Sequence, residues 1–112
     1  MTWEEYNNLF ESILSGEFTD KPYDNPAYTN YASLNASRQK RWMKRGALNE
    51  ELVATLEGLN FKQTWTLISE PWCGDASHIA PFIAKLAETS SNIDFRVNLR
   101  DGEDSMIQDY LT

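Results

Sequence analysis

The stretch that most constrains the fold of this chain is TWTLISEPWCGDASHIAP, from Thr64 to Pro81. Its first six residues are mostly β-branched, aromatic or apolar and end before Glu70-Pro71, which is typical of a short buried strand. From Asp75 onward the apolar residues fall at helical intervals, at Ile79, Phe82, Ile83 and Leu86. The sequence therefore predicts a strand, a tight turn and a helix that buries those four residues.

Cys73 is the only cysteine of the chain, and it falls in this turn, just before the predicted helix. Unpaired backbone N–H groups and the positive end of the helix dipole favour a thiolate at such a position. Asp75 and Glu70 oppose a thiolate, because their charges have the same sign. The alternative is an unreactive, half-buried thiol packed beside Trp72. For Trp72 two roles stay open together: covering a peptide or thiol substrate, and shielding the turn from water.

The turn and helix, Trp72-Cys73-Gly74-Asp75-Ala76 followed by Ile79-Ala80-Pro81, resemble the active-site segment of thioredoxin-fold proteins. That family has the pattern W-C-G-x-C with a helix proline eight residues after the first cysteine, and Pro81 stands eight residues after Cys73. The chain is most similar to the bacterial group whose turn reads W-C-G-D, and the resemblance covers residues 49–112. It implies that Cys73 is the reactive thiol and that Trp72, Gly74 and Asp75 contact the substrate.

Three departures from the family pattern limit what the resemblance implies. Ala76 occupies the position of the resolving cysteine, so an external thiol such as glutathione would have to release any mixed disulfide. Leu67 occupies a strand position that is often a buried acid in the family. In the family fold, a loop with a cis-proline, two strands and a helix follow the position that corresponds to Thr112. We therefore expect a fold that is incomplete at its C-terminus.

The N-terminal part predicts helices outside that core fold. Thr2 and Glu5 form a possible capping box for a helix that ends before Gly16. Its apolar stripe would be Trp3, Tyr6, Phe10, Ile13 and Leu14. Residues 17–30 contain two prolines and read as a loop, whose Tyr23 and Tyr28 either pin it to the surface beneath or stack on a ligand. A second helix over residues 31–45 would be anchored by Tyr31, Leu34, Trp42 and Met43.

The remaining segments complete the predicted α/β fold. Asn49 is a good N-cap for a helix to about Leu59, with Leu52, Val53, Leu56 and Leu59 facing the core. Residues 93–99 alternate apolar with polar and predict a second strand, which would run parallel to the first after a helical crossover. Residues 103–112 predict the start of another helix. The expected organisation is an N-terminal helical extension, residues 1–47, and a partial thioredoxin-like domain, residues 48–112.

Composition limits the classes of partner. The net charge of −7 argues against nucleic-acid binding, and the five basic residues between Arg38 and Arg45 are interpreted as a solvated face. No apolar run is long enough to span a membrane and no signal sequence is visible, which favours a cytoplasmic protein. One cysteine and one histidine, His78, leave too few ligands for a zinc site, and no cofactor is expected. The exposed edges of a two-stranded sheet favour partial disorder, self-association or coverage by the N-terminal helices.

Two functions remain open from the sequence. The first is thiol-disulfide exchange through Cys73 as a single nucleophile, with a protein disulfide or a glutathione-type thiol as partner. The second is a non-catalytic protein-binding module on the same scaffold. The absence of a resolving cysteine favours the second function, and the presence of a cysteine in the turn favours the first.

Overall fold

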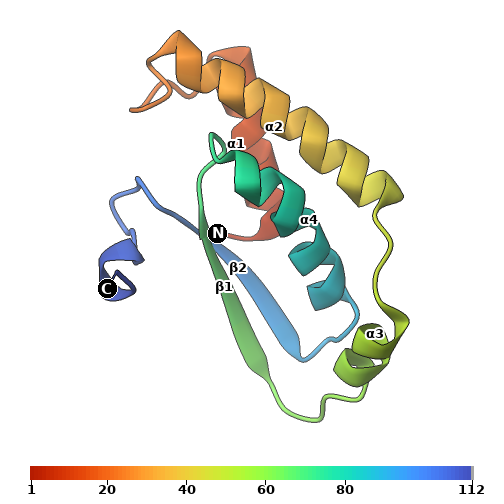
Figure 1. Ribbon diagram of the computed structural model, residues 1–112. Coiled ribbons are helices and arrows are strands. Elements are labelled where there is room, and N and C mark those ends of the chain that lie inside the picture. The colour runs from red at the N-terminus through yellow and green to blue at the C-terminus, as the bar shows by residue number, and fades with distance from the viewer. Residues whose placement is uncertain (112) are drawn as a thin grey trace.

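The computed structural model describes residues 1–111 of the chain. Its elements are, in order, α1 (Trp3–Ser15), α2 (Pro26–Arg45), α3 (Glu50–Glu57), β1 (Gln63–Ser69), α4 (Gly74–Glu88), β2 (Ile93–Leu99) and a short 3₁₀ helix, η1 (Ile107–Asp109). The two strands pair in parallel, with Gln63 opposite Ile93 and Ser69 opposite Leu99. Helix α4 connects the strands, so the predicted α/β fold with a parallel βαβ unit is confirmed (Figure 1).

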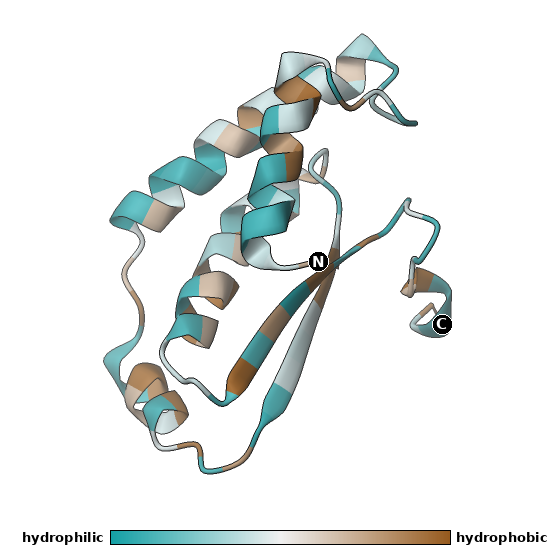
Figure 2. Cartoon of the chain, turned by 180° about the vertical axis from the view of Figure 1, so that it is seen from behind, coloured by the Kyte–Doolittle hydropathy of each residue, from teal (hydrophilic) through white to brown (hydrophobic). Residues whose placement is uncertain are grey.

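The sheet buries one of its faces. Ile93 and Val97 are buried, whereas Asp94 and Arg96, on the opposite face of β2, are exposed. Figure 2 shows the same alternation as brown and teal bands along this strand. Helices α1, α2 and α4 lie together on one side of the sheet (Figure 1), so the core forms between them and the apolar face.

Helix α1 forms as predicted. Thr2 and Glu5 make the capping box, and Gly16 ends the helix in the left-handed conformation, with a φ of 84°. The predicted stripe is wrong at one position, because Leu14 is exposed and Leu9 is buried in its place. Leu9 and Ile13 are four residues apart, so they share the face of the helix that packs on the core.

Helix α2 begins at Pro26, so the predicted start at residue 31 is wrong and the predicted loop is confirmed only over residues 17–25. Asn25 caps the helix by accepting a hydrogen bond from the Ala27 N–H group, and a proline at the first helical position loses no hydrogen bond. Tyr31 and Leu34 are exposed rather than anchoring. The buried positions are instead small or polar, namely Ala32, Asn35, Ala36 and Gln39.

Helix α4 also buries small residues, and the predicted apolar face is wrong there. Ile79 is 55% exposed and Phe82, Ile83 and Leu86 are only partly buried. The helix packs against α2 and both strands, and its buried side chains are Ser77, Ala80, Pro81, Ala84 and Ala87. Helices surrounded by other elements pack closely through such small side chains, and this places the larger apolar residues toward the sides.

Helix α3 and the C-terminal segment lie at the periphery (Figure 1). Asn49 caps α3 as predicted, and Leu56 is buried against Ala87 and Ile93, but Leu52 is exposed. The helix predicted for residues 103–112 is wrong over the described residues, which form turns and η1. The Asn98 side chain binds the Asp104 carbonyl and the Met106 N–H group, and these bonds hold a turn in place of a helix. Thr112 lies outside the described residues.

The N-terminal segment packs directly on the sheet. The Tyr6 hydroxyl lies 3.2 Å from the Ser69 hydroxyl, and Met1 makes two backbone hydrogen bonds with Val97, both of 2.8 Å. Met1 therefore covers the edge of β2 at Val97. The boundary between residues 47 and 48 stays a prediction. In the described part of the chain, no helix is both long and apolar enough to cross a membrane.

Candidate functional site

The candidate site is the turn between β1 and α4, residues 70–76. Cys73 is the N-cap of α4, as predicted, and its side chain makes no capping hydrogen bond. Its backbone N–H group donates to the Glu70 carbonyl at 2.9 Å, which closes the turn. The thiol is half-buried and unpaired. A sulfur atom at this position is next to the unpaired N–H groups of the first helical turn.

Helix α2 holds one side of this turn. The Asn35 side chain, which is 1% exposed, donates to the Pro71 carbonyl at 2.9 Å. Arg38 donates to the Asn35 side-chain oxygen at 3.0 Å and so fixes the orientation of the amide. A Cβ atom added to Gly74 would lie 3.5 Å from the Arg38 guanidinium, so that positive group lies beside the first residue of α4.

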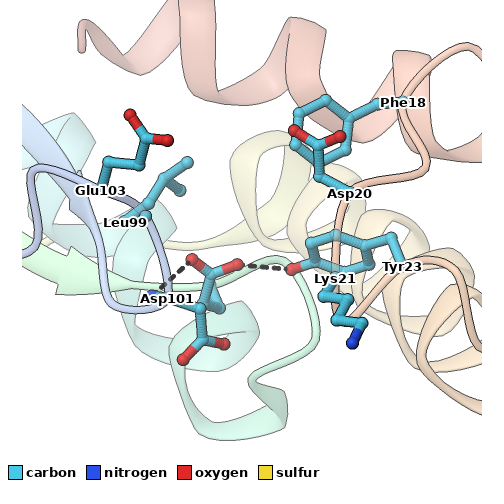
Figure 3. A pocket seen from close by; sticks show the side chains of 9 residues that line it. Phe18, Asp20, Lys21, Tyr23, Leu99, Asp101 and Glu103 are labelled. Atoms are coloured by element: carbon cyan, nitrogen blue, oxygen red, sulfur yellow. Dashed lines mark hydrogen bonds between the residues drawn. The ribbon is translucent and has the colours of Figure 1, made fainter.

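Glu70 holds the other side of the turn through a buried hydrogen-bond network. The Tyr23 hydroxyl donates to one carboxylate oxygen at 2.7 Å, and the Asp101 N–H group donates to the other at 3.1 Å. Figure 3 shows both bonds as dashed lines that converge on one carboxylate. The Tyr23 hydroxyl also accepts a hydrogen bond from the Trp72 N–H group at 3.3 Å. Three segments that are distant in sequence therefore meet at Glu70.

Burial controls the protonation of this network. It raises the pKa of the Glu70 carboxyl, and the hydrogen bonds from Tyr23 and Asp101 offset that increase only in part. Burial also raises the pKa of the Tyr23 hydroxyl, and the neighbouring Glu70 carboxylate raises it further. Tyr23 therefore keeps its proton at neutral pH and acts as the donor.

Trp72 is fixed in place by two neighbours. Its indole N–H group donates to the Asp101 carboxylate at 2.8 Å, and its ring meets Tyr28 edge to face with the centroids 5.9 Å apart. Arg100 pairs with the other oxygen of the Asp101 carboxylate at 2.9 Å. The indole beside Cys73 is consequently a rigid surface.

The other residues singled out from the sequence occupy the first turns of α4. Asp75 is exposed, and Ala76 is partly buried. His78 is exposed and accepts a hydrogen bond from the Trp42 indole through Nδ1 at 2.9 Å, so it is oriented toward α2. The roles predicted for Cys73, Trp72, Gly74 and Asp75 stay predictions.

Two hollows flank the Glu70 network. The first, about 280 Å³ in volume, is lined in part by Tyr23 and Glu70, and Figure 3 shows Phe18 and Asp20 across from Leu99 and Glu103. The second, which we call the Trp72 hollow, is about 410 Å³ in volume. Its lining residues are Lys21, Pro22, Tyr28, Trp72, Arg100 and Asp101.

A family model described as Thioredoxin matches residues 22–112, which is most of the chain. The chain belongs to the thioredoxin family. The matched region of this thioredoxin-family chain includes α2 as well as the βαβ unit. Searches of curated proteins and of solved structures found no significant match.

Sequence reasoning missed most of the side chains that shape this thioredoxin-family turn. Asn35 has one sequence signal, the glycosylation sequon Asn35-Ala36-Ser37, which does not predict its buried bond to Pro71, and Asp101 is predicted only as part of a turn. Tyr23 was interpreted correctly, since it pins its loop to the surface beneath. The available signal was Glu70, an acid at the end of an apolar strand, because a buried carboxylate needs hydrogen-bond donors.

Proposed function

We propose that this protein is a thioredoxin-like protein that carries out thiol-disulfide exchange through Cys73 as its single active-site thiol. The observation that carries this proposal is the position of Cys73 as the N-cap of a fifteen-residue helix, with the thiol free of any capping bond. The positive end of the helix dipole lies at this position, and the Arg38 guanidinium adds a positive charge beside Gly74, the next residue.

The proposed exchange has two steps. The Cys73 thiolate attacks one sulfur of a substrate disulfide, which forms a mixed disulfide and releases the other sulfur as a thiolate. A thiolate from an external thiol such as glutathione then attacks the substrate sulfur of the mixed disulfide. The Cys73 thiolate is the leaving group, and the external thiol stays disulfide-bonded to the substrate sulfur. Because Ala76 stands at the resolving position, the external thiol performs the second step.

The direct test is the rate of alkylation of Cys73 against pH on the folded protein, with Cys73→Ser as the blank. A midpoint well below ~8.5, the value for a free thiol, supports a stabilised thiolate. Formation of a mixed disulfide with oxidised glutathione, lost in Cys73→Ser, supports the exchange. A midpoint at or above ~8.5, or no labelling until the protein unfolds, would overturn the proposal.

A second function, a non-catalytic protein-binding module, is favoured by one separate observation. The backbone of the turn is already bonded within the chain, because Tyr23 accepts from the Trp72 N–H group and Asn35 donates to the Pro71 carbonyl. Partner binding that is unchanged in Cys73→Ser, together with a Cys73 thiol that is not alkylated in the folded protein, would support this function and contradict the first.

Several finer expectations belong with this proposal. They are membership of the bacterial group with the W-C-G-D turn, a cytoplasmic location, and independence from metals and other cofactors. Self-association of the chain is a further expectation. Sedimentation equilibrium tests this self-association, and a monomer at all concentrations would contradict it.

A further inference from the structure

The Trp72 hollow lies directly beside the residue that carries the thiol. Its walls come from four segments: the loop before α2, α2 itself, the turn before α4, and the turn after β2. Trp72 immediately precedes Cys73 in the chain, so a molecule held against the indole lies next to the N-terminus of α4. The hollow is therefore placed to hold the part of a substrate that flanks its disulfide.

Two aromatic rings form a fixed apolar surface in this hollow. Tyr28 and Trp72 meet at an interplanar angle of 87°, and the hydrogen bond to Asp101 holds the indole in place. Rigid aromatic surfaces contact apolar side chains at a low cost in conformational entropy. They favour a leucine-like side chain in the ligand.

The charged side chains that line the hollow differ in whether they are free to bind a ligand. Asp101 is already engaged, because one carboxylate oxygen pairs with Arg100 and the other accepts from Trp72. Lys21 is exposed, and it makes no ion pair with any residue between 1 and 111. Figure 3 shows its ammonium group apart from the Asp101 carboxylate. The group left to meet a ligand is therefore a cation, in a chain whose net charge is −7.

The neighbouring hollow has the opposite character. It is lined by the same Lys21 and Asp101, but also by Asp20, Glu70 and Glu103. An anionic group is repelled from that side and attracted to Lys21 from the Trp72 side. The pair of hollows thus gives a bound anion one favoured position.

We propose that the Trp72 hollow binds the peptide segment that flanks the substrate disulfide and selects a segment in which an aspartate or glutamate adjoins an apolar side chain. This inference rests on the function proposed above, since it describes the substrate of the same site. In this proposal Lys21 selects the acidic side chain of the peptide, and Tyr28 and Trp72 select its apolar side chain.

The test uses the full chain carrying Cys73→Ser, so that no covalent bond forms. Three peptides with blocked ends, Ser-X-Leu-Ser, differ only at X, which is Glu, Gln or Lys. Each is titrated into the protein while the indole N–H resonance of Trp72 is followed by NMR. The Glu peptide should bind roughly three- to five-fold more tightly than the Gln peptide, as for one exposed charge contact, and the Lys peptide should bind least tightly. High salt should remove the difference.

Lys21→Met should reduce the affinity for the Glu peptide to that for the Gln peptide, whereas Lys62→Met, an exposed control on another part of the surface, should not. Equal affinities for the three peptides, or equal effects of the two lysine variants, would overturn the inference. Discrimination among peptides with an unreactive Cys73 would support the hollow and overturn the redox function. A reactive Cys73 without discrimination would overturn only this inference.

Discussion

The Tyr23 hydroxyl donates a 2.7 Å hydrogen bond to the Glu70 carboxylate across 47 positions of the sequence. Both residues are buried, and the same hydroxyl accepts from the Trp72 N–H group. One phenol oxygen therefore joins the loop before α2 to the turn that carries Cys73.

Tyr23→Phe should lower the free energy of unfolding by about 2 kcal/mol, because it leaves a buried carboxylate oxygen and a backbone N–H group without their partner. Tyr31→Phe removes the hydroxyl from an exposed tyrosine and should change stability by less than about 0.5 kcal/mol. Urea unfolding of both variants measures this. An equal loss in the two variants would contradict the importance of the Tyr23–Glu70 bond.

Glu70 should make stability fall as the pH rises. Its pKa is raised above 4.5 in the folded state, so between 4.5 and that raised value the native state binds more protons than the unfolded state. Ionisation of the buried carboxyl then destabilises the native state with increasing pH. Comparing unfolding free energies from pH 4 to 8 for the wild type and Glu70→Gln isolates this contribution, because the other carboxyls are common to both. A difference that is constant with pH would refute it.

Gly46→Ala should destabilise the protein by about 1–3 kcal/mol through overpacking. A Cβ atom at this position would lie 2.6 Å from the Trp42 carbonyl oxygen and 2.8 Å from the Phe82 ring. Gly58 is the matched control, since it also ends a helix at negative φ, but its added Cβ atom would meet no atom closer than 3.5 Å. Thermal unfolding of the two variants should show a lower Tm for Gly46→Ala only.

Asp75→Asn should increase the alkylation rate of Cys73 at neutral pH about two- to three-fold in low salt, because it removes an exposed negative charge two residues from the sulfur. Asp24→Asn, also exposed but in the loop before α2, should leave the rate unchanged. High salt should reduce the effect of Asp75→Asn. An identical rate in the wild type and Asp75→Asn would mean that this carboxylate does not influence the thiol.

The sequence predicted the elements best where local signals agree. Thr2, Gly16 and Asn49 mark helix ends through their own backbone and side-chain chemistry, and the alternation from Ile93 to Leu99 marks β2. The start of α2 was missed because Asn25-Pro26 is a turn signal as well as a helix start.

The predicted helix faces failed where tertiary packing decides burial. In α2 and α4 the buried positions are alanines, polar residues and Pro81, which carry little hydrophobic signal, while Leu34 and Ile79 remain exposed. The candidate turn was found from Trp72 and Cys73. The partners of its backbone were not, because contacts such as that between Asn35 and Pro71, 36 positions apart, have no local signature.

The meeting of three segments at Glu70 has a consequence for hydrogen exchange. The amides of Trp72 and Asp101 are bonded to Tyr23 and Glu70 respectively, and the Tyr23–Glu70 bond links the two. Release of the loop before α2 breaks that link and should open both amides to solvent in one cooperative event, with a single opening free energy. The amide exchange rate in the turn that holds Cys73 would thus be set by the opening of a loop nearly fifty residues upstream of it.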